Sequence, residues 1–474
     1  MKYLDLLTVI PGIESPKKRL NFNDKLKWTG LILIIYFILG QITVWGVSQQ
    51  GVAQFQFLQT ILASRFGSLV TLGIGPIVTA SIILQLLTGS DLLQWDTNTP
   101  EGKRLFMGTQ KLLAVTFCIV QAFAYVSFGA IPPNPGIPFS TFVVIAQIAV
   151  GGILVVLMDE VISKWGFGSG VSLFIAGGVS MQIIQKLLNP LVMPRGGTPH
   201  FPKAGDFSSG YIPRIFQTLL SANPMEVLIV FIPVLFTIAL FFIVVYVNSM
   251  KVEIPLAFGQ VKGFGQRYPL NFLYTSVIPL IFVRAFLANI NIMGKMLANK
   301  GLPILGAYSG GTPQSGLMYW IYSPKVTTPR IGLFSKMIIN AIRGSSLPGI
   351  TLAWIPYTIV ICAGAIVFSV FWSKTSGQDS ATVAERIHSM GMSVPGYRRD
   401  KRIIKRILDR YIPYLAVLSG LFIGLLSVFA DFFGAVSSGT GILLATMIIY
   451  RMYEELAKQH MEDMHPALRK FMGS

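Results

Sequence analysis

Apolar segments about 20 residues long recur along this chain, and they restrict its fold more than any other feature. A helix of that length crosses the hydrocarbon core of a bilayer, which is ~30 Å thick. Of the 474 residues, 53% are hydrophobic and only 12% are charged, whereas soluble domains carry roughly 25% charged residues. We therefore expect an all-α polytopic membrane protein, and we exclude a soluble enzyme, a disulfide-rich extracellular scaffold and an ordinary nucleic-acid-binding protein.

Ten segments are predicted to be membrane-spanning helices. Because ten is an even number, both termini are expected on one side of the membrane. The predicted spans are residues 28–47, 70–88, 109–131, 140–162, 168–188, 225–248, 270–290, 348–372, 411–430 and 434–452.

The basic residues indicate the orientation. When the spans alternate in direction, most of the 38 Lys and Arg residues fall on the same side as the termini. Loops rich in Lys and Arg remain cytoplasmic, so we expect both termini in the cytosol and the chain in the cytoplasmic membrane. The expected divisions are a cytosolic N-terminal segment 1–27, a first five-helix half 28–188, an external loop 189–224, a second half 225–452 and a cytosolic tail 453–474.

Two cytosolic loops of the second half, 249–269 and 373–410, are expected to carry much of the basic charge. They have two interpretations. They could be ordinary anchors that fix the orientation, or they could present their charges to an acidic or phosphate-rich partner such as RNA.

Each half contains an odd number of spans, so the two halves must insert in opposite senses. Inverted repeats of this kind place the functional site at their interface, and corresponding Gly or Pro breaks point to it. Such breaks occur at Gly75-Pro76 in span 70–88 and at Pro279 in span 270–290. We expect the site where these two spans meet.

The middles of the predicted spans contain almost no ionisable groups, and Arg284 is the single deep candidate. A coupled transporter usually needs such groups. Cys118 and Cys362 lie in apolar spans and are expected to be packing residues, and no His spacing indicates a metal site. No catalytic group or cofactor is predicted. A ring of aliphatic side chains can instead seal a pore against ions and still admit an extended polypeptide.

Five segments, in order along the chain, resemble the SecY family, the channel subunits of the Sec translocon. They are LGIGPIVTASIILQLL (72–87), DEVISKWGFGSGVSLFI (159–175), YTSVIPLIF (274–282), MSVPGYR (392–398) and SGTGILL (438–444). The sequences of these segments resemble the archaeal and eukaryotic branch of the family more than the bacterial branch. The resemblance implies two inverted five-helix halves around an hourglass pore, through which unfolded polypeptides cross the membrane. It also implies a lateral gate that releases hydrophobic segments into lipid.

The resemblance implies roles for three groups of residues in this sequence. The polar segment 51–68 matches the plug that closes the external side of the pore. The lateral gate would use Thr79, Gln121 and Asn289. The pore ring would consist of six aliphatic residues, namely Ile74, Val78, Val171, Ile175, Ile281 and Leu444.

The resemblance also implies partners. Arg267 and Arg398 match positions that dock a translating ribosome, through contacts with ribosomal RNA. Small membrane subunits of the SecE type and of the SecG or beta type are expected, together with signal peptides, nascent chains and membrane lipids. The family implies a passive channel with no cofactor, so the chain is not expected to be an enzyme.

Two other classes of function remain open. One is a secondary transporter of a small solute with the same inverted-repeat architecture, and the other is an insertase without a continuous pore. Arg284 departs from the family pattern, because small or apolar residues are expected there. Either it faces an aqueous funnel, or the placement of Ile281 in the pore ring is wrong.

Overall fold

The fold is taken from a computed structural model that describes most of the chain. The described residues are 12–18, 20–47, 65–89, 92–93, 95, 99–129, 131–134, 136, 138–192, 200–203, 206–220, 224–258, 265–299, 301–309, 312–321, 354–389, 392–393, 400–434, 436 and 439–464.

Ten helices overlap the ten predicted spans, five in each half. The first half contains α2 (Phe22–Gln41), α5 (Gly75–Gly89), α6 (Pro100–Ser127), α7 (Ser140–Trp165) and α8 (Gly170–Leu188). The second half contains α10 (Pro224–Ser249), α11 (Ile278–Asn299), α14 (Trp354–Thr375), α17 (Ile412–Phe433) and α18 (Gly439–Met464). Among the described residues, 7 helical segments are long and apolar enough to cross a membrane by themselves.

Two of the predicted boundaries are wrong for the same reason. The helix α5 begins at Gly75 and α11 begins at Ile278, later than the predicted starts at 70 and 270. In both places an irregular segment precedes the helix and is largely buried by the rest of the chain. Hydropathy alone cannot distinguish a buried irregular segment from a helical one. The shift also places Lys295 inside α11, in a span predicted to carry no lysine.

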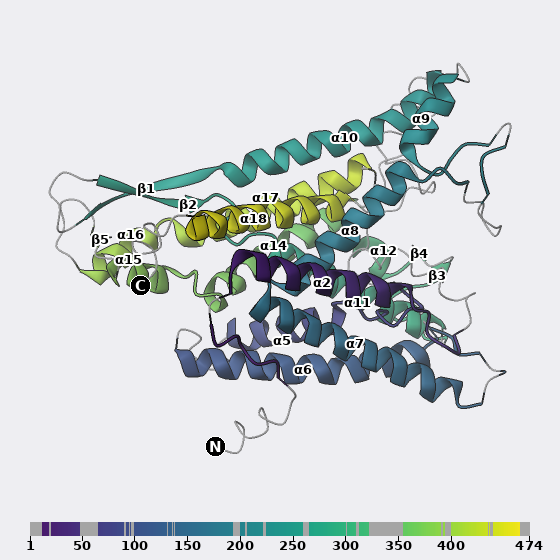
Figure 1. Ribbon diagram of the computed structural model, residues 1–474, viewed down its shortest axis with the longest axis horizontal. Helices are drawn as coiled ribbons and strands as arrows, with labels where there is room; N and C mark the ends of the chain where they lie inside the picture. Colours follow the sequence, from purple (N-terminus) through teal and green to yellow (C-terminus); the bar gives the residue numbers. More distant parts are fainter. Residues whose placement is uncertain are drawn as a thin grey trace.

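The two basic regions predicted as loops are instead folded together at one end of the molecule (Figure 1). Strands β1 (Lys251–Phe258), β2 (Gly265–Asn271) and β5 (Met392–Ser393) form an antiparallel sheet in the order β2-β1-β5. Helices α15 (Ser380–Ser389) and α16 (Lys401–Leu408) pack with the sheet around a separate hydrophobic core. We call this unit the basic subdomain. The all-α prediction is therefore correct for the membrane helices but misses this sheet.

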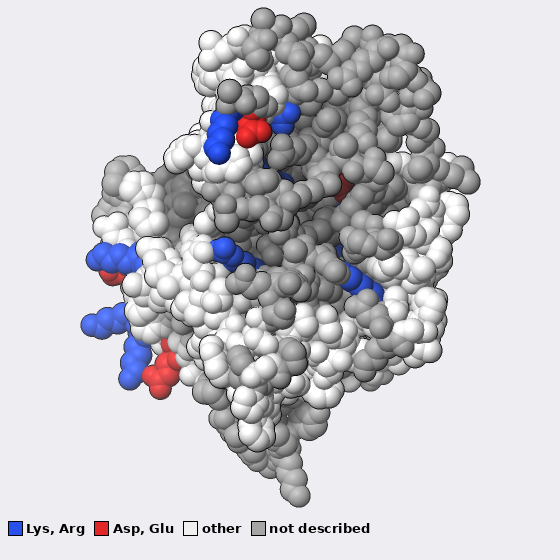
Figure 2. Space-filling view, turned by 90° about the vertical axis from the view of Figure 1, so that its right-hand side faces the viewer, with Lys and Arg blue, Asp and Glu red and all other residues white. Residues whose placement is uncertain are grey.

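The opposite end of the molecule carries short elements between the long helices. They are α9 (Tyr211–Leu220), the hairpin strands β3 (Tyr308–Ser309) and β4 (Thr312–Pro313), and α12 (Leu317–Ile321). Figure 2 looks onto this end, where most of the described side chains are neither acidic nor basic.

The first and the last long helix meet. Lys25 Nζ at the start of α2 donates a hydrogen bond to Gln459 Oε1 of α18 over 3.2 Å. The rings of Phe22 and His460 are 5.2 Å apart. In Figure 1, α18 ends toward the side that carries the basic subdomain. Both described ends of the membrane bundle therefore lie on one side, as an even number of spans requires.

Candidate pore and lateral gate

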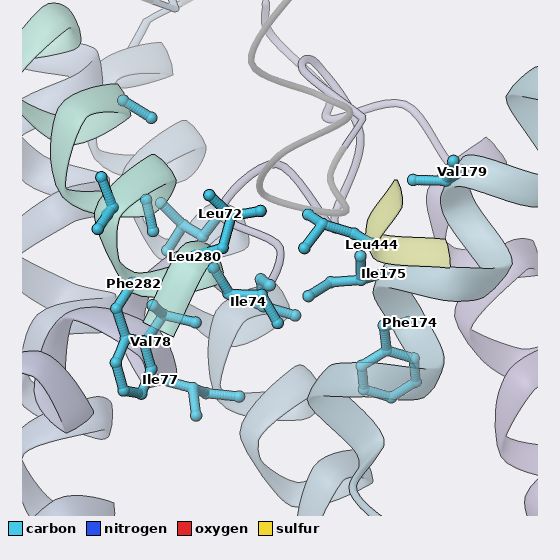
Figure 3. Packing of buried hydrophobic residues seen from close by; sticks show 14 of the residues in the cluster. Leu72, Ile74, Ile77, Val78, Phe174, Ile175, Val179, Leu280, Phe282 and Leu444 are labelled. Carbon is cyan, nitrogen blue, oxygen red and sulfur yellow. The ribbon is translucent and has the colours of Figure 1, made fainter. Parts of the chain in front are cut away.

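The six candidate pore residues lie within one hydrophobic cluster shared by both halves. Five of them are buried, and Val171 is partly buried against the same cluster. In Figure 3, Ile74 and Val78 come from the start of α5, while Ile175 of α8 and Leu444 of α18 extend toward them. Leu72 and Leu280 lie beside them and were not predicted as pore residues.

A left-handed residue and a proline position the start of α5. Gly73 has φ +52°, and Pro76 lies three residues later in the first turn of the helix. Proline suits the first turn because its fixed φ is helical and its missing N–H is not needed there. The N–H of Gly75 donates to Leu72 O over 3.0 Å, and the N–H of Val78 donates to Ile74 O over 3.0 Å. Ile74 and Val78 are therefore held at a fixed helix start.

The start of α11 repeats this arrangement in the second half. Ser276 has φ +59°, and Pro279 again lies three residues later. The N–H of Ile281 donates to Val277 O over 3.2 Å. Val78 and Ile281 thus occupy the same position, two residues after the proline, on the corresponding helices of the two halves.

A second correspondence joins α8 and α18. At the end of α7, Asp159 Oδ1 accepts the N–H of Val171 in the first turn of α8 over 2.9 Å. At the end of α17, Asp431 Oδ1 accepts the N–H of Thr440 in the first turn of α18 over 3.2 Å. A carboxylate satisfies the free N–H groups of a helix start and interacts favourably with its dipole.

The two acid-capped helices carry candidate pore residues in the same register. Ile175 lies four residues after Val171, and Leu444 lies four residues after Thr440. In each half, the acid therefore fixes the helix start one turn before the aliphatic side chain. The sequence predicted neither acid as a cap.

The three candidate gate residues form one hydrogen-bonded group across three helices. Thr79 of α5 accepts the N–H of Gln121 of α6 over 3.2 Å and the N–H of Asn289 of α11 over 3.0 Å. Its own hydroxyl donates to Gly75 O over 2.8 Å. The contact between Thr79 and Asn289 joins the two halves directly, at the interface where the proline breaks indicated a site.

The YTS residues before α11 anchor that helix start to the rest of the second half. Tyr274 Oη donates to Gln378 O over 2.6 Å, and burial raises the pKa of Tyr274. The hydroxyl of Thr275 lies 2.7 Å from that of Ser369 and 3.2 Å from that of Ser419. These contacts hold the irregular segment against α14 and α17.

Arg284 neither faces an aqueous funnel nor displaces Ile281, which stays buried in the hydrophobic cluster, because Arg284 pairs with a carboxylate of α17. Its side chain is 6% exposed and its Nη2 atom lies 2.8 Å from Asp431 Oδ2. The predicted span 411–430 ends one residue before Asp431, so hydropathy did not pair the two residues. An arginine in an apolar helix needs a carboxylate at the same depth, and this requirement was the signal that could have identified Asp431.

The remaining predictions fall largely outside the described residues. Only residues 65–68 of the predicted plug segment are described, and Arg398 is not described. The backbone of Arg267 lies in β2, paired with Pro255 of β1. Residue 393, five positions before Arg398, pairs with Ala257 of the same strand. Strands β2 and β5 therefore flank the same strand, β1, in the sheet.

Comparison with known proteins supports these assignments of fold. The family model described as SecY matches residues 68–453, and that of the plug domain of Sec61p matches residues 34–67. A protein translocase subunit SecY of Methanocaldococcus jannaschii is 42% identical over 100% of this chain and 99% of its own length.

Solved structures agree. One described as a protein conducting channel has a TM-score of 0.80 at 40% identity, covering 98% of both chains. Sec61 in the canine ribosome-channel complex has a TM-score of 0.77 at 40% identity, again over 98% of both chains. The chain belongs to the SecY family.

Proposed function

We propose that this chain is the channel subunit of a protein translocase in the cytoplasmic membrane. It passes unfolded secretory polypeptides through a ring of aliphatic side chains and releases hydrophobic segments sideways into lipid. The related proteins of known name support this activity, since they are translocase subunits and protein-conducting channels. The channel performs no chemistry of its own, and a partner supplies the driving force.

One observation carries the pore proposal: four candidate ring residues are matched between the halves. Val78 and Ile281 share a register set by proline, and Ile175 and Leu444 share a register set by a capping carboxylate. Two inverted halves around one axis place equivalent side chains on opposite sides of that axis. Ile74 and Val171 complete the proposed ring. The same register makes Val277, which is 3% exposed, the counterpart of Ile74.

The hydrogen bonds of Thr79 support a lateral gate between α5, α6 and α11. Two amide bonds of ~0.6 kcal/mol each are typical of polar contacts between membrane helices. An apolar segment that inserts between α5 and α11 can outcompete them by burying its own side chains. Gln121 and Asn289 would then set how hydrophobic a signal peptide must be.

The basic subdomain is proposed to face the cytosol and to dock a translating ribosome. Its β2 strand carries Arg267, and the segment after β5 carries Arg398. The related Sec61 protein was solved in a ribosome-channel complex. Both termini would then be cytosolic, and the boundaries 28–188 and 225–452 would delimit the halves. Segment 51–68 would be the plug, and small SecE-type and SecG-type subunits would complete the complex.

Site-specific crosslinking tests the central pore. The protein with its small partner subunits is placed in liposomes, with cysteine introduced separately by Val78→Cys and Ile281→Cys, and a secretory chain is stalled on a bound ribosome. We expect both cysteines to crosslink to the stalled chain and to lose the crosslink once the chain is released. Phe123→Cys on α6 is the control, because this side chain is 58% exposed on the outside of the bundle.

Two other outcomes would favour a different function. Crosslinks at position 123 with none at positions 78 and 281 would reject the central pore and favour an insertase. Flux of a small solute in liposomes that contain no polypeptide substrate would favour the secondary transporter.

A further inference from the structure

Arg284 is the centre of a buried polar network that the proposed translocation path does not use. Its Nη1 donates to Tyr357 Oη of α14 over 2.6 Å, and its Nη2 donates to Asp431 Oδ2 of α17 over 2.8 Å. Nη2 also donates to Ser427 Oγ of α17, and the guanidinium carbon lies 5.5 Å from the centre of the Tyr357 ring. One guanidinium from α11 therefore joins two further helices.

Asp431 extends the network to a fourth helix. Besides Arg284, it accepts the hydroxyl of Tyr357 over 2.8 Å and the backbone N–H of Thr440 over 3.2 Å. The hydroxyl of Thr440 lies 3.0 Å from Asp431 Oδ2 and 3.1 Å from Ser427 Oγ. The start of α18 is thus tied to α11 through a single carboxylate.

Stability alone does not account for such a pair. Taking two charges out of water costs about as much as their attraction returns, and apolar residues of similar volume are often as stable or better. A paired guanidinium and carboxylate also fix the distance and the orientation between the helices that carry them, because their hydrogen bonds are directional.

The network lies one helical turn from two candidate ring residues. Ile281 precedes Arg284 by three residues on α11, and Leu444 follows Thr440 by four residues on α18. Side chains spaced by three or four residues share one face of a helix. Through Arg284 and Thr440, the network is therefore linked to the two helices that carry the ring residues of the second half.

We propose that Arg284 and Asp431 are positioning residues that set the relative placement of Ile281 and Leu444, and so the closed width of the ring. The inference rests on the proposed pore function. Loosening the network would let the two side chains separate, and a hydrophobic constriction that widens admits water and ions.

The test compares two variants that each remove one buried hydroxyl. Tyr357→Phe removes the hydroxyl that bridges Arg284 and Asp431. Ser208→Ala is the control, because its buried hydroxyl accepts the N–H of Gln217 of α9 over 2.8 Å and belongs to no element that carries a ring residue. A double variant, Arg284→Met with Asp431→Leu, removes the whole ion pair without leaving a buried charge.

Resting ion conductance in planar bilayers without a polypeptide substrate is the readout, with the thermal unfolding midpoint measured alongside. We expect the conductance of the Tyr357→Phe and double variants to rise at least about fivefold, the lower end of typical coupling between sites. Ser208→Ala should lower the midpoint as well and leave conductance unchanged. This separates a positioning role from a purely structural one.

Equal conductance in Tyr357→Phe, Ser208→Ala and the unmodified protein would overturn the inference. This holds even if the double variant does not fold. The failure of the proposed function would look different, because the stalled chain would then not crosslink at position 78 in the unmodified protein. Normal crosslinking with unchanged conductance rejects only the positioning role.

Discussion

At the scale of the residue, the hydrogen bonds of the proposed gate converge on a single hydroxyl. Thr79 accepts both amide N–H groups. Its replacement therefore affects both bonds at once. Asn289 is the partner from the opposite half, so its loss affects only the contact between the halves.

We predict that Thr79→Val lowers the hydrophobicity that a signal peptide needs. Losing two bonds of ~0.6 kcal/mol changes the balance between closed and open gate by about 1.2 kcal/mol, or roughly sevenfold. The measurement is the fraction of chains translocated for a series of signal peptides with decreasing leucine content. Asn289→Leu should shift the same curve in the same direction by a smaller amount.

Thr116→Val is the control for this series. Thr116 is an exposed threonine of α6 whose hydroxyl donates only to Leu112 O, over 2.9 Å. Its replacement removes the same chemical group without affecting contacts between helices. A shift of the curve as large as that of Thr79→Val would contradict the gate assignment.

At the scale of the element, the starts of α5 and α11 depend on one residue with positive φ each. Glycine adopts this conformation freely, whereas a serine is uncommon there. The first half uses Gly73 and the second half uses Ser276. The two positions should therefore respond differently to substitution.

Ser276→Gly is expected to be neutral or slightly stabilising, while Ser276→Val is expected to destabilise by about 1–2 kcal/mol because a β-branched residue resists a left-handed backbone. The thermal unfolding midpoint of the purified protein reports this difference. Equal midpoints for the two variants would show that the helix start relaxes without cost.

Close packing makes a second prediction at this scale. A Cβ on Gly151 of α7 would lie 1.9 Å from Leu69 O, in the irregular segment before α5. Gly151→Ala must push the two backbones apart and should cost about 1–3 kcal/mol. A Cβ on Gly30 of α2 meets nothing within 4 Å, so Gly30→Ala should not lower the unfolding midpoint. Equal unfolding midpoints for the two variants would contradict the close contact between α7 and the segment before α5.

The sequence was sufficient for the ten helices because about 20 apolar residues have few other stable arrangements. It was insufficient where a structure depends on distant partners. The pairing of Ala257 with Ser393 joins two segments more than 130 residues apart, so the basic subdomain was expected as loops. Arg284 was recognised as unusual, but hydropathy does not reveal that Asp431 lies at the same depth.

At the scale of the whole molecule, several exposed basic side chains of the described residues gather on the basic subdomain. Exposed basic side chains follow the outward face of α16, while Ile404 and Leu408 face the core of the basic subdomain. This surface extends the docking region proposed for Arg267 and Arg398. Its four exposed members on α16 are Lys401, Arg402, Lys405 and Arg406.

We predict that Lys405→Gln with Arg406→Gln weakens ribosome binding and reduces its salt dependence. Each phosphate contact that is lost should lower the slope of log K against log salt concentration by about 1, so the double variant should lose about 2. Co-sedimentation with ribosomes over a range of salt concentrations measures the slope. The exposed pair at the start of α6 provides the control, through Lys103→Gln with Arg104→Gln. An unchanged slope in the first variant would remove α16 from the docking surface.

The repeated helix starts of α5 and α11 also have a consequence for ancestry. A left-handed residue followed three positions later by a proline is a short sequence pattern. Duplication of one gene segment would produce this pattern twice. Two copies that insert in opposite directions would supply both walls of the bundle from one coding sequence. A gene of half this length, translated into a chain able to adopt either orientation, could therefore have preceded the fused form. Duplication and fusion would then have freed Gly73 and Ser276 to diverge.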